Sequence, residues 1–149
     1  MCSGIALAYS QLPLPLIAAR GLAERVHERG GEKEVRFYYR AAEPLLPVWH
    51  EGRLKLVRWG LRPGQSDELP AGGWVLEEVA ASLGGVRVDI PAALGYANGI
   101  WFRITQGVRG VLAEGERGPV VYMLVEPASH YYQTMTKSRQ MPVLIGERI

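Results

Sequence analysis

The stretch RLKLVRWGLRPG, residues 53–64, decides the fold that we predict for this chain. Leu54 and Leu56 alternate with charged residues, which is the period-2 pattern of a half-buried strand. Trp59 closes the strand with a large apolar side chain, and the glycine after it allows the backbone to bend. Pro63 cannot donate to a ladder and ends the strand. The pattern predicts a central strand and turn whose Trp59 is buried in the core.

The composition is that of one globular domain, residues 1–149, with 48% hydrophobic and 21% charged residues. The net charge of +2 and the sequence pI of about 8.8 permit a nucleic-acid partner without requiring one. A single cysteine leaves no internal disulfide and no cysteine-based metal site, so we expect no metal and no cofactor. No signal peptide and no apolar run of about 20 residues is present, so we expect a cytoplasmic protein without a membrane partner. The oligomeric state stays open.

Strand patterns outnumber helix patterns on both sides of this stretch. Strands are predicted over residues 5–9, 34–40, 44–49, 86–90, 108–113, 119–125 and 141–145, and helices over 16–29, 73–82 and 127–135. Pro47 places the strand 44–49 near a sheet edge. Because short turns join most of the strands, the predicted fold class is α+β, with mostly antiparallel strands in a barrel-like sheet and two or three short helices.

Positive charge is concentrated between residues 36 and 62, which we call the basic stretch. Its basic residues are Arg36, Arg40, Arg53, Lys55, Arg58 and Arg62, and with two glutamates its charge is 6 − 2 = +4. It also holds Tyr38, Tyr39, Trp49 and Trp59. Basic side chains interleaved with aromatic rings suit a groove for single-stranded DNA. The alternative is a solvated sheet face above an aromatic core. We take Arg40, Arg58 and Arg62, together with Arg139 near the end of the chain, as the candidate DNA-binding residues.

Cys2 follows the initiator Met1, which is commonly removed when the next residue is small. An N-terminal cysteine carries an amine and a thiol on adjacent carbons. The amine can condense with an aldehyde to an imine, and the thiol can then close a stable thiazolidine ring. The open form of an abasic deoxyribose presents such an aldehyde. The alternative is that Cys2 packs as a small hydrophobic residue at the start of the first strand.

Three motifs in this order resemble the SRAP family, the SOS-response-associated peptidase domains that shield abasic sites in single-stranded DNA. They are Met1-Cys2 at the start, WGLRP at residues 59–63, and RQMPVLI at residues 139–145. The resemblance implies an SRAP-type fold and a single-stranded DNA partner in the DNA damage response. It also implies a covalent thiazolidine link from Cys2 to abasic sites once Met1 is removed. The peptidase activity in the family name would be the self-processing of Met1.

Several family positions hold other residues here. The family's late His falls on Ser138, and His130 lies eight residues upstream as a second candidate. The family's central Glu has no counterpart near Trp101, where Asn98 is the only polar side chain within three residues on the N-terminal side. The candidate catalytic residues are therefore Cys2, Asn98 and Ser138. Asn98 cannot shuttle protons as a carboxylate does.

Two further departures concern DNA contacts. Gln65 occupies the position of the aromatic residue that wedges into DNA in the family. The family's Asn-Ala-Arg-x-Glu segment keeps only its Glu, as Glu77. Two hypotheses remain: an enzyme-like protein that links Cys2 to abasic sites, and a catalytically degenerate SRAP-fold binding module of phage origin. Whether Met1 is removed separates them, because a retained Met1 blocks the aminothiol.

Overall fold

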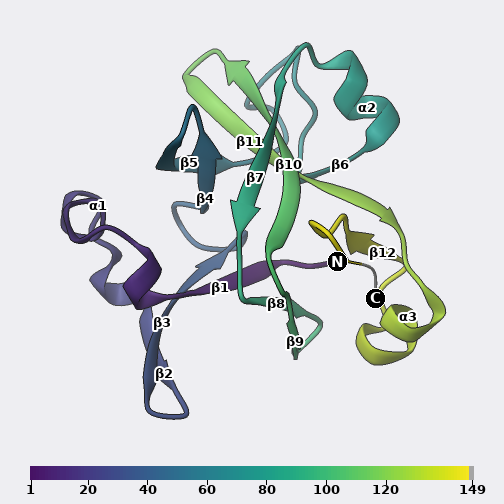
Figure 1. Ribbon diagram of the computed structural model, residues 1–149. Helices are drawn as coiled ribbons and strands as arrows, with labels where there is room; N and C mark the ends of the chain where they lie inside the picture. Colours follow the sequence, from purple (N-terminus) through teal and green to yellow (C-terminus); the bar gives the residue numbers. More distant parts are fainter. Residues whose placement is uncertain (148–149) are drawn as a thin grey trace.

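Five strands close into a ring in the computed structural model, which describes residues 1–147 (Figure 1). They are β4 (Leu45–His50), β5 (Arg53–Trp59), β7 (Val86–Pro91), β10 (Gly107–Gly115) and β11 (Gly118–Pro127). The order is β10–β7–β4–β5–β11, and the ring closes where β11 pairs with β10. The pairing of β5 with β11 is parallel, and the other junctions of the ring are antiparallel. The predicted α+β class with a barrel-like, mostly antiparallel sheet is confirmed.

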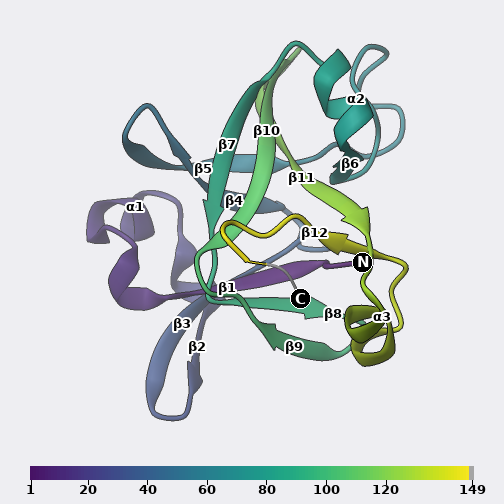
Figure 2. The ribbon, with the colours of Figure 1, turned by 45° about the vertical axis from the view of Figure 1, so that its right-hand side comes forward.

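A second sheet lies against the barrel and carries the N-terminus (Figure 2). Its strands, in spatial order, are β2 (Val26–Arg29), β3 (Glu32–Tyr38), β1 (Gly4–Ala8), β8 (Leu94–Ala97) and β9 (Ile100–Arg103). Two short strands, β6 (Trp74–Leu76) and β12 (Gln140–Pro142), pair with β11. The helices are α1 (Leu14–Ala19), α2 (Glu77–Ser82) and α3 (His130–Thr136). Helix α3 lies beside the N-terminus in both ribbon views.

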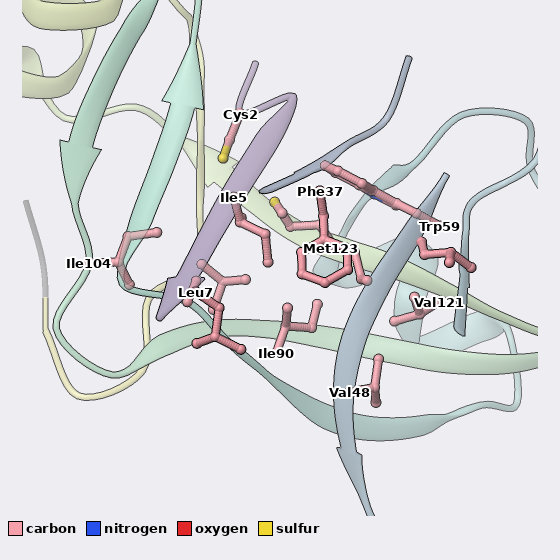
Figure 3. Packing of buried hydrophobic residues seen from close by; sticks show 14 of the residues in the cluster. Cys2, Ile5, Leu7, Phe37, Val48, Trp59, Ile90, Ile104, Val121 and Met123 are labelled. Atoms are coloured by element: carbon pink, nitrogen blue, oxygen red, sulfur yellow. The ribbon is translucent and has the colours of Figure 1, made fainter. Parts of the chain in front are cut away.

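The core fills the space between the barrel and the second sheet, and Trp59 lies in it (Figure 3). The Trp59 side chain has no exposed surface, and its indole N–H donates to the carbonyl of Gly73 at 2.9 Å. Ile5 and Phe37 face each other across β1 and β3 and are also fully buried. The prediction of a central strand that ends in a buried Trp59 is therefore correct.

The long helix predicted over residues 16–29 is wrong. Helix α1 ends at Ala19, and Gly21 adopts a left-handed conformation with φ of 62° that no α-helix continues through. A 3₁₀ turn follows at Leu22–Arg25, and the remaining residues form β2. The apolar residues at helical spacing stop at Val26, which pairs with Val35 of β3 instead. A hairpin thus replaces the second half of the predicted helix.

Other predicted bounds need smaller corrections. Residues 73–82 begin as β6 and become helical only at Glu77. The last predicted helix starts at His130, because Pro127 still belongs to β11. The predicted closing strand 141–145 is shorter, as β12, with Leu144 in an isolated bridge to Val108.

The edge position predicted for strand 44–49 is also wrong. Strand β4 lies between β5 and β7 in the barrel. The pairing of β4 with β7 is confined to Trp49 and Asp89. Pro47, which has no backbone N–H to donate, therefore lies outside the part of β4 that pairs with β7.

The hairpin of β8 and β9 was not predicted from the sequence. Its turn is Asn98-Gly99, and both residues have positive φ, 49° and 83°. Asn-Gly is the favoured pair for a two-residue hairpin turn of this handedness. The turn carries Asn98 to the end of α3, where the candidate site is formed.

No helix among residues 1–147 is both long and apolar enough to cross a bilayer.

Candidate functional site

The first three residues are held in place from both sides by backbone and indole donors. The N–H of Ser3 donates to the carbonyl of Tyr96 at 2.8 Å, and the N–H of Tyr39 donates to the carbonyl of Ser3 at 3.0 Å. The indole N–H of Trp74 donates to the carbonyl of Cys2 at 2.8 Å. Residues 1–3 are therefore a fixed part of the fold, immediately before β1.

Residues far apart in the sequence meet at the N-terminal amine. The α-ammonium group of Met1 donates to Ser138 Oγ at 2.6 Å. Asn98 Nδ2 donates to the same oxygen at 3.2 Å and to the carbonyl of Thr136 at 2.8 Å. The structure thus brings two of the three candidate catalytic residues, Asn98 and Ser138, to the amine of Met1, and the third, Cys2, follows Met1 in the chain. We call Met1, Cys2, Asn98 and Ser138 the N-terminal cluster.

Ser138 points inward because the chain reverses directly after α3. Lys137 has φ of 61°, and its N–H donates to the carbonyl of Gln133 at 2.8 Å, which closes the helix. Ser138 follows with 3% exposure, and its N–H donates to Thr136 Oγ1 at 3.3 Å. Its neighbours Lys137 and Arg139 are both exposed. Residues 137–139 therefore present a hydroxyl to the amine of Met1 and two cationic side chains to solvent.

The Cys2 thiol is buried, with 1% of the residue exposed. Its Sγ donates to the carbonyl of Gly4 at 3.3 Å, and the side chain packs above Ile5 (Figure 3). Burial raises the pKa of the Cys2 thiol to about 11, so the group is a neutral thiol at neutral pH. In this form Cys2 acts as a small hydrophobic residue, and an aldehyde would reach it only after a local rearrangement.

Tyr132 is a buried polar residue of the site that the sequence did not indicate. It has no exposed surface, its ring packs edge-on against Phe102 with centroids 5.2 Å apart, and burial raises its pKa, with a further contribution from nearby Cys2. Among residues 1–147 its hydroxyl is the one buried side-chain oxygen or nitrogen without a hydrogen-bond partner.

Trp74 was also missed, and it belongs to an aromatic cluster behind Cys2. Its ring centroid lies 4.7 Å from that of Tyr39 and 5.7 Å from that of Trp59. Tyr39 and Trp59 are 5.6 Å apart. This packing orients the indole N–H that holds the Cys2 carbonyl. Residues 73–77, where the resemblance implied an Asn and an Arg, contribute an indole donor from Trp74.

The aromatic residues of the basic stretch form no common surface. Trp59 is in the core and Trp49 is 47% exposed on the barrel. Tyr38 packs instead against Tyr96 and Trp101 on the second sheet, with centroids 5.8 and 6.2 Å away.

The cations of the basic stretch make separate contacts. Arg36 is paired with Glu34 at 2.8 Å. Arg58 donates to the Gly60 carbonyl and to Gln65 Oε1, and Arg62 donates to the Ala41 carbonyl and lies 5.7 Å from the Tyr39 ring centroid. Arg40 is exposed. Arg139, the fourth DNA-binding candidate, lies apart from these residues at the end of α3.

Two other predicted features can be located. His130 is the first residue of α3 and is exposed, and within residues 1–147 it makes no hydrogen bond to the N-terminal cluster. No group of three or more His, Cys, Asp or Glu residues in the same range could hold a metal ion. No protein-family model matches this chain, and no curated protein does.

Proposed function

We propose that this protein is an SRAP-like protein that binds single-stranded DNA and links Cys2 covalently to abasic sites after Met1 is removed. The observation that carries the proposal is the N-terminal cluster. Cys2, Asn98 and Ser138 were selected from three separate motif positions, and the amine of Met1 and the amide of Asn98 share Ser138 Oγ as acceptor. A chance match of short motifs gives no reason for these residues to meet.

The chemistry starts when removal of Met1 turns the Cys2 nitrogen into a free amine. The amine attacks the aldehyde carbon, one water leaves, and an imine forms. The thiol sulfur then adds to the imine carbon, and its proton ends on the ring nitrogen. In the chain that still carries Met1, Ser138 accepts a hydrogen bond from the amine of Met1, one residue before the Cys2 nitrogen. In the proposed reaction Ser138 orients the amine of Cys2 and the hydroxyl of the first adduct.

The cluster has no strong acid or base of its own. Ser138 and Asn98 orient groups but neither take up nor release a proton near neutral pH. General acid–base catalysis is typically worth 10²- to 10⁴-fold, so the linkage should be slower than in a site that has a carboxylate. Asn98→Asp places a carboxylate at this turn with little backbone cost, because Asp tolerates the left-handed conformation of Asn98, and it gives up the two hydrogen bonds that Asn98 Nδ2 donates to Thr136 and Ser138.

The test uses single-stranded DNA with one abasic site and a denaturing gel after heating. Wild type should form a heat-stable conjugate, Cys2→Ala should form none, and Asn98→Asp should react at least about tenfold faster. Ser138→Ala should slow the reaction. Ser66→Ala is the matched control, because Ser66 Oγ accepts only from its own turn, at Glu68 and Leu69. Equal conjugation by wild type and Cys2→Ala, or none by wild type over hours, would refute the proposal.

The burial of Cys2 favours a second candidate function, a catalytically inactive binding module. A thiol with 1% exposure and a raised pKa reacts poorly, and it makes an adequate core residue as it stands. In that case Cys2→Ala would bind undamaged single-stranded DNA as tightly as wild type, and neither would form a conjugate. The gel and a binding titration together separate the two functions.

A further inference from the structure

A small hollow lies between the loop that follows β5 and the turn that joins β10 to β11. Its volume is about 90 Å³, and its walls come from residues 58–66 and 115–120. The β10–β11 turn lies in the upper part of Figures 1 and 2, whereas the N-terminus and α3 lie lower. We call this feature the loop hollow, and it is separate from the N-terminal cluster.

The loop that forms one wall is held in shape by its own hydrogen bonds. Leu61 and Gly72 exchange backbone hydrogen bonds at 3.0 and 2.6 Å, which closes the loop at its base. Within the loop, Ser66 Oγ accepts from the N–H groups of Glu68 and Leu69 at 3.1 and 3.0 Å. The opposite wall is a tight turn between paired strands. A ligand would therefore find the hollow already formed and would not have to order it.

The guanidinium group of Arg58 is fixed in orientation at this hollow. Its Nε donates to the carbonyl of Gly60 at 3.2 Å, and its Nη2 donates to Gln65 Oε1 at 2.7 Å. The same Gln65 oxygen accepts from the N–H of Arg62 at 2.8 Å, so the Gln65 amide is fixed as well. Arg58 Nη1 makes no hydrogen bond within residues 1–147. A positioned donor group thus remains for a further acceptor.

The cations of the loop hollow have no close counter-ion. Arg58 is half-buried, and Arg117 is exposed at the rim. Glu116 is the one carboxylate of the lining, and in the described part of the chain no carboxylate oxygen lies within 4.0 Å of either guanidinium group. In another hollow, by contrast, Arg87 is paired with Glu77 at 2.6 Å. The loop hollow therefore favours an anion.

The rest of the lining is largely apolar. Leu61 and Val120 are 9% and 3% exposed and belong to a core cluster with Tyr122, and Pro119 lies beside them in the lining. Apolar walls with a few oriented polar groups are typical of small-molecule sites. The hollow is smaller than the cavity of about 150 Å³ that takes benzene, so the apolar part of a ligand is limited to a few carbons.

The geometry of the donor group favours a carboxylate over a phosphate. A planar guanidinium matches a planar carboxylate, and the match gives strong, directed hydrogen bonds. A phosphate group carries more charge and more acceptor oxygens, and the apolar side chains of Leu61 and Val120 cannot satisfy them. One fixed guanidinium with apolar walls therefore suits a single negative charge on a short carbon chain.

We propose that the loop hollow is a binding site for a short aliphatic carboxylate. Arg58 binds the carboxylate group, Arg117 contributes attraction from the rim, and Leu61 and Val120 contact the aliphatic chain. The site does not depend on the chemistry of the N-terminal cluster, and no covalent step occurs in it. A bound carboxylate connects the loop to the β10–β11 turn, so it should also raise the temperature of unfolding.

The test is an NMR titration of the whole chain with 3-methylbutanoate. The amide of the same acid has the same shape without the charge, and acetate has the charge without the chain. The carboxylate should bind at least about tenfold more tightly than the amide, the effect of one charge-assisted hydrogen bond. It should also bind more tightly than acetate. The largest changes in chemical shift should fall in residues 58–66 and 115–120.

Three variants assign the preference for the carboxylate to its residues. Arg58→Gln should bring the affinities for carboxylate and amide close together. Arg117→Ala should lower the affinity for the carboxylate by about two- to threefold, because an exposed charge is partly screened. Arg103→Ala, which removes an exposed arginine from β9 on the second sheet, should leave both affinities unchanged. The same spectra show whether each variant is folded. If Arg58→Gln does not fold, Arg117→Ala and the comparison of the ligands on wild type still decide the question.

Several results would overturn the proposal. Equal affinities of wild type for carboxylate and amide, or a preference that survives in Arg58→Gln, would show that Arg58 does not bind the carboxylate. Acetate or inorganic phosphate that binds as tightly as 3-methylbutanoate would show a general anion site without a role for the apolar walls. Displacement of 3-methylbutanoate by undamaged single-stranded DNA would make the hollow part of a DNA contact instead of a separate site.

Discussion

The basic stretch and the N-terminal cluster behave in opposite ways when the chain folds. The basic stretch, residues 36–62, is contiguous in sequence, yet its cations and rings are distributed over the barrel, the core and the second sheet. Met1, Asn98 and Ser138 of the N-terminal cluster are separated by up to 137 positions, yet the Met1 amine and the Asn98 amide both donate to the Ser138 hydroxyl. Concentration of charge along a sequence is therefore weak evidence for a binding surface.

Strand geometry explains the difference. Successive side chains of a strand point to opposite faces, so a run of alternating basic and apolar residues is divided between solvent and core. Trp59 takes the core side, while Arg58 beside it stays at the surface. A site assembled from a turn, a helix end and a chain terminus depends instead on the topology of the fold. The residues adjacent to each member in the sequence do not show that the members will meet.

The largest predicted effect separates the core and surface aromatic residues of the basic stretch. Trp59→Ala should lower the free energy of unfolding by about 3–5 kcal/mol, because it leaves a large cavity and removes one of the two hydrogen bonds to the Gly73 carbonyl. Trp49→Ala should change it by no more than about 0.5 kcal/mol, since Trp49 is 47% exposed. Urea unfolding of both variants beside wild type measures the contrast. If Trp59→Ala unfolded at the same urea concentration as wild type, the assignment of Trp59 to the core would be wrong.

The next prediction concerns the neutralisation of Arg36. Glu34 is 8% exposed, and although burial opposes its ionisation, hydrogen bonds from Arg29 and Arg36 hold its pKa below the ordinary value. Glu34→Gln should therefore cost about 1.5–3 kcal/mol at pH 7. The two arginines also lie 4.9 and 5.1 Å from the Trp101 ring, and this packing should loosen.

The pH dependence of that effect follows from the direction of the shift. A carboxyl group whose pKa is lower in the folded state stabilises the fold above its unfolded pKa of about 4.3 and loses this contribution as the pH falls through the folded value. Wild type should lose stability in acid, below about pH 4, more steeply than Glu34→Gln. Parallel curves of unfolding free energy against pH for the two proteins would show that the pair contributes nothing.

A smaller effect tests the unpaired hydroxyl beside the N-terminal cluster. Tyr132→Phe should raise the free energy of unfolding by up to about 1 kcal/mol, because a buried hydroxyl without a partner is costly. Tyr122→Phe is the matched control: its hydroxyl donates to the Pro70 carbonyl at 2.7 Å, so its loss should cost about 1 kcal/mol. Thermal unfolding of both variants shows whether each substitution raises or lowers the free energy of unfolding. A loss of stability in Tyr132→Phe would mean that the hydroxyl has a partner in solution.

The smallest effects concern DNA binding by the basic stretch. If single-stranded DNA binds there through roughly three to five phosphates, Arg58→Ala and Arg62→Ala should each reduce the log–log salt slope by at most about one. Arg62→Ala should have the larger effect, because the exposed Arg62 side chain donates to the Ala41 carbonyl, whereas the half-buried Arg58 side chain donates to both Gly60 and Gln65. Fluorescence titrations over a range of salt concentrations measure both slopes. Unchanged slopes would remove these two arginines from the DNA contact.

Much of the fold follows from local patterns in the sequence. The strand at residues 53–59 follows from its alternating residues, although Leu56 and Val57 are both buried, and the hairpin of β10 and β11 follows from two apolar runs joined by a polar turn with glycines. The long helix failed because residues 26–29 were consistent with both helix and strand, and pairing with β3 decided between them. The Asn98-Gly99 turn could have been predicted, since that pair between apolar residues is a strong hairpin signal.

The site was only partly accessible from the sequence. Motif positions selected Cys2, Asn98 and Ser138, but nothing local showed that they would meet. Tyr132 and Trp74 belong to no motif in the sequence. Tyr132 matters because it is fully buried, and Trp74 matters because its indole N–H donates to the Cys2 carbonyl. The raised pKa of Cys2 also depends on burial by segments distant in the chain. Such properties come from tertiary packing.

The intact mass of the purified protein, before and after incubation with single-stranded abasic DNA, tests the central claim most directly. We predict a protein lighter by one methionine that then gains the mass of the oligonucleotide minus one water, with no gain for Cys2→Ala. A protein that keeps Met1 and gains no mass, or a Cys2→Ala variant that gains as much as wild type, would contradict the account.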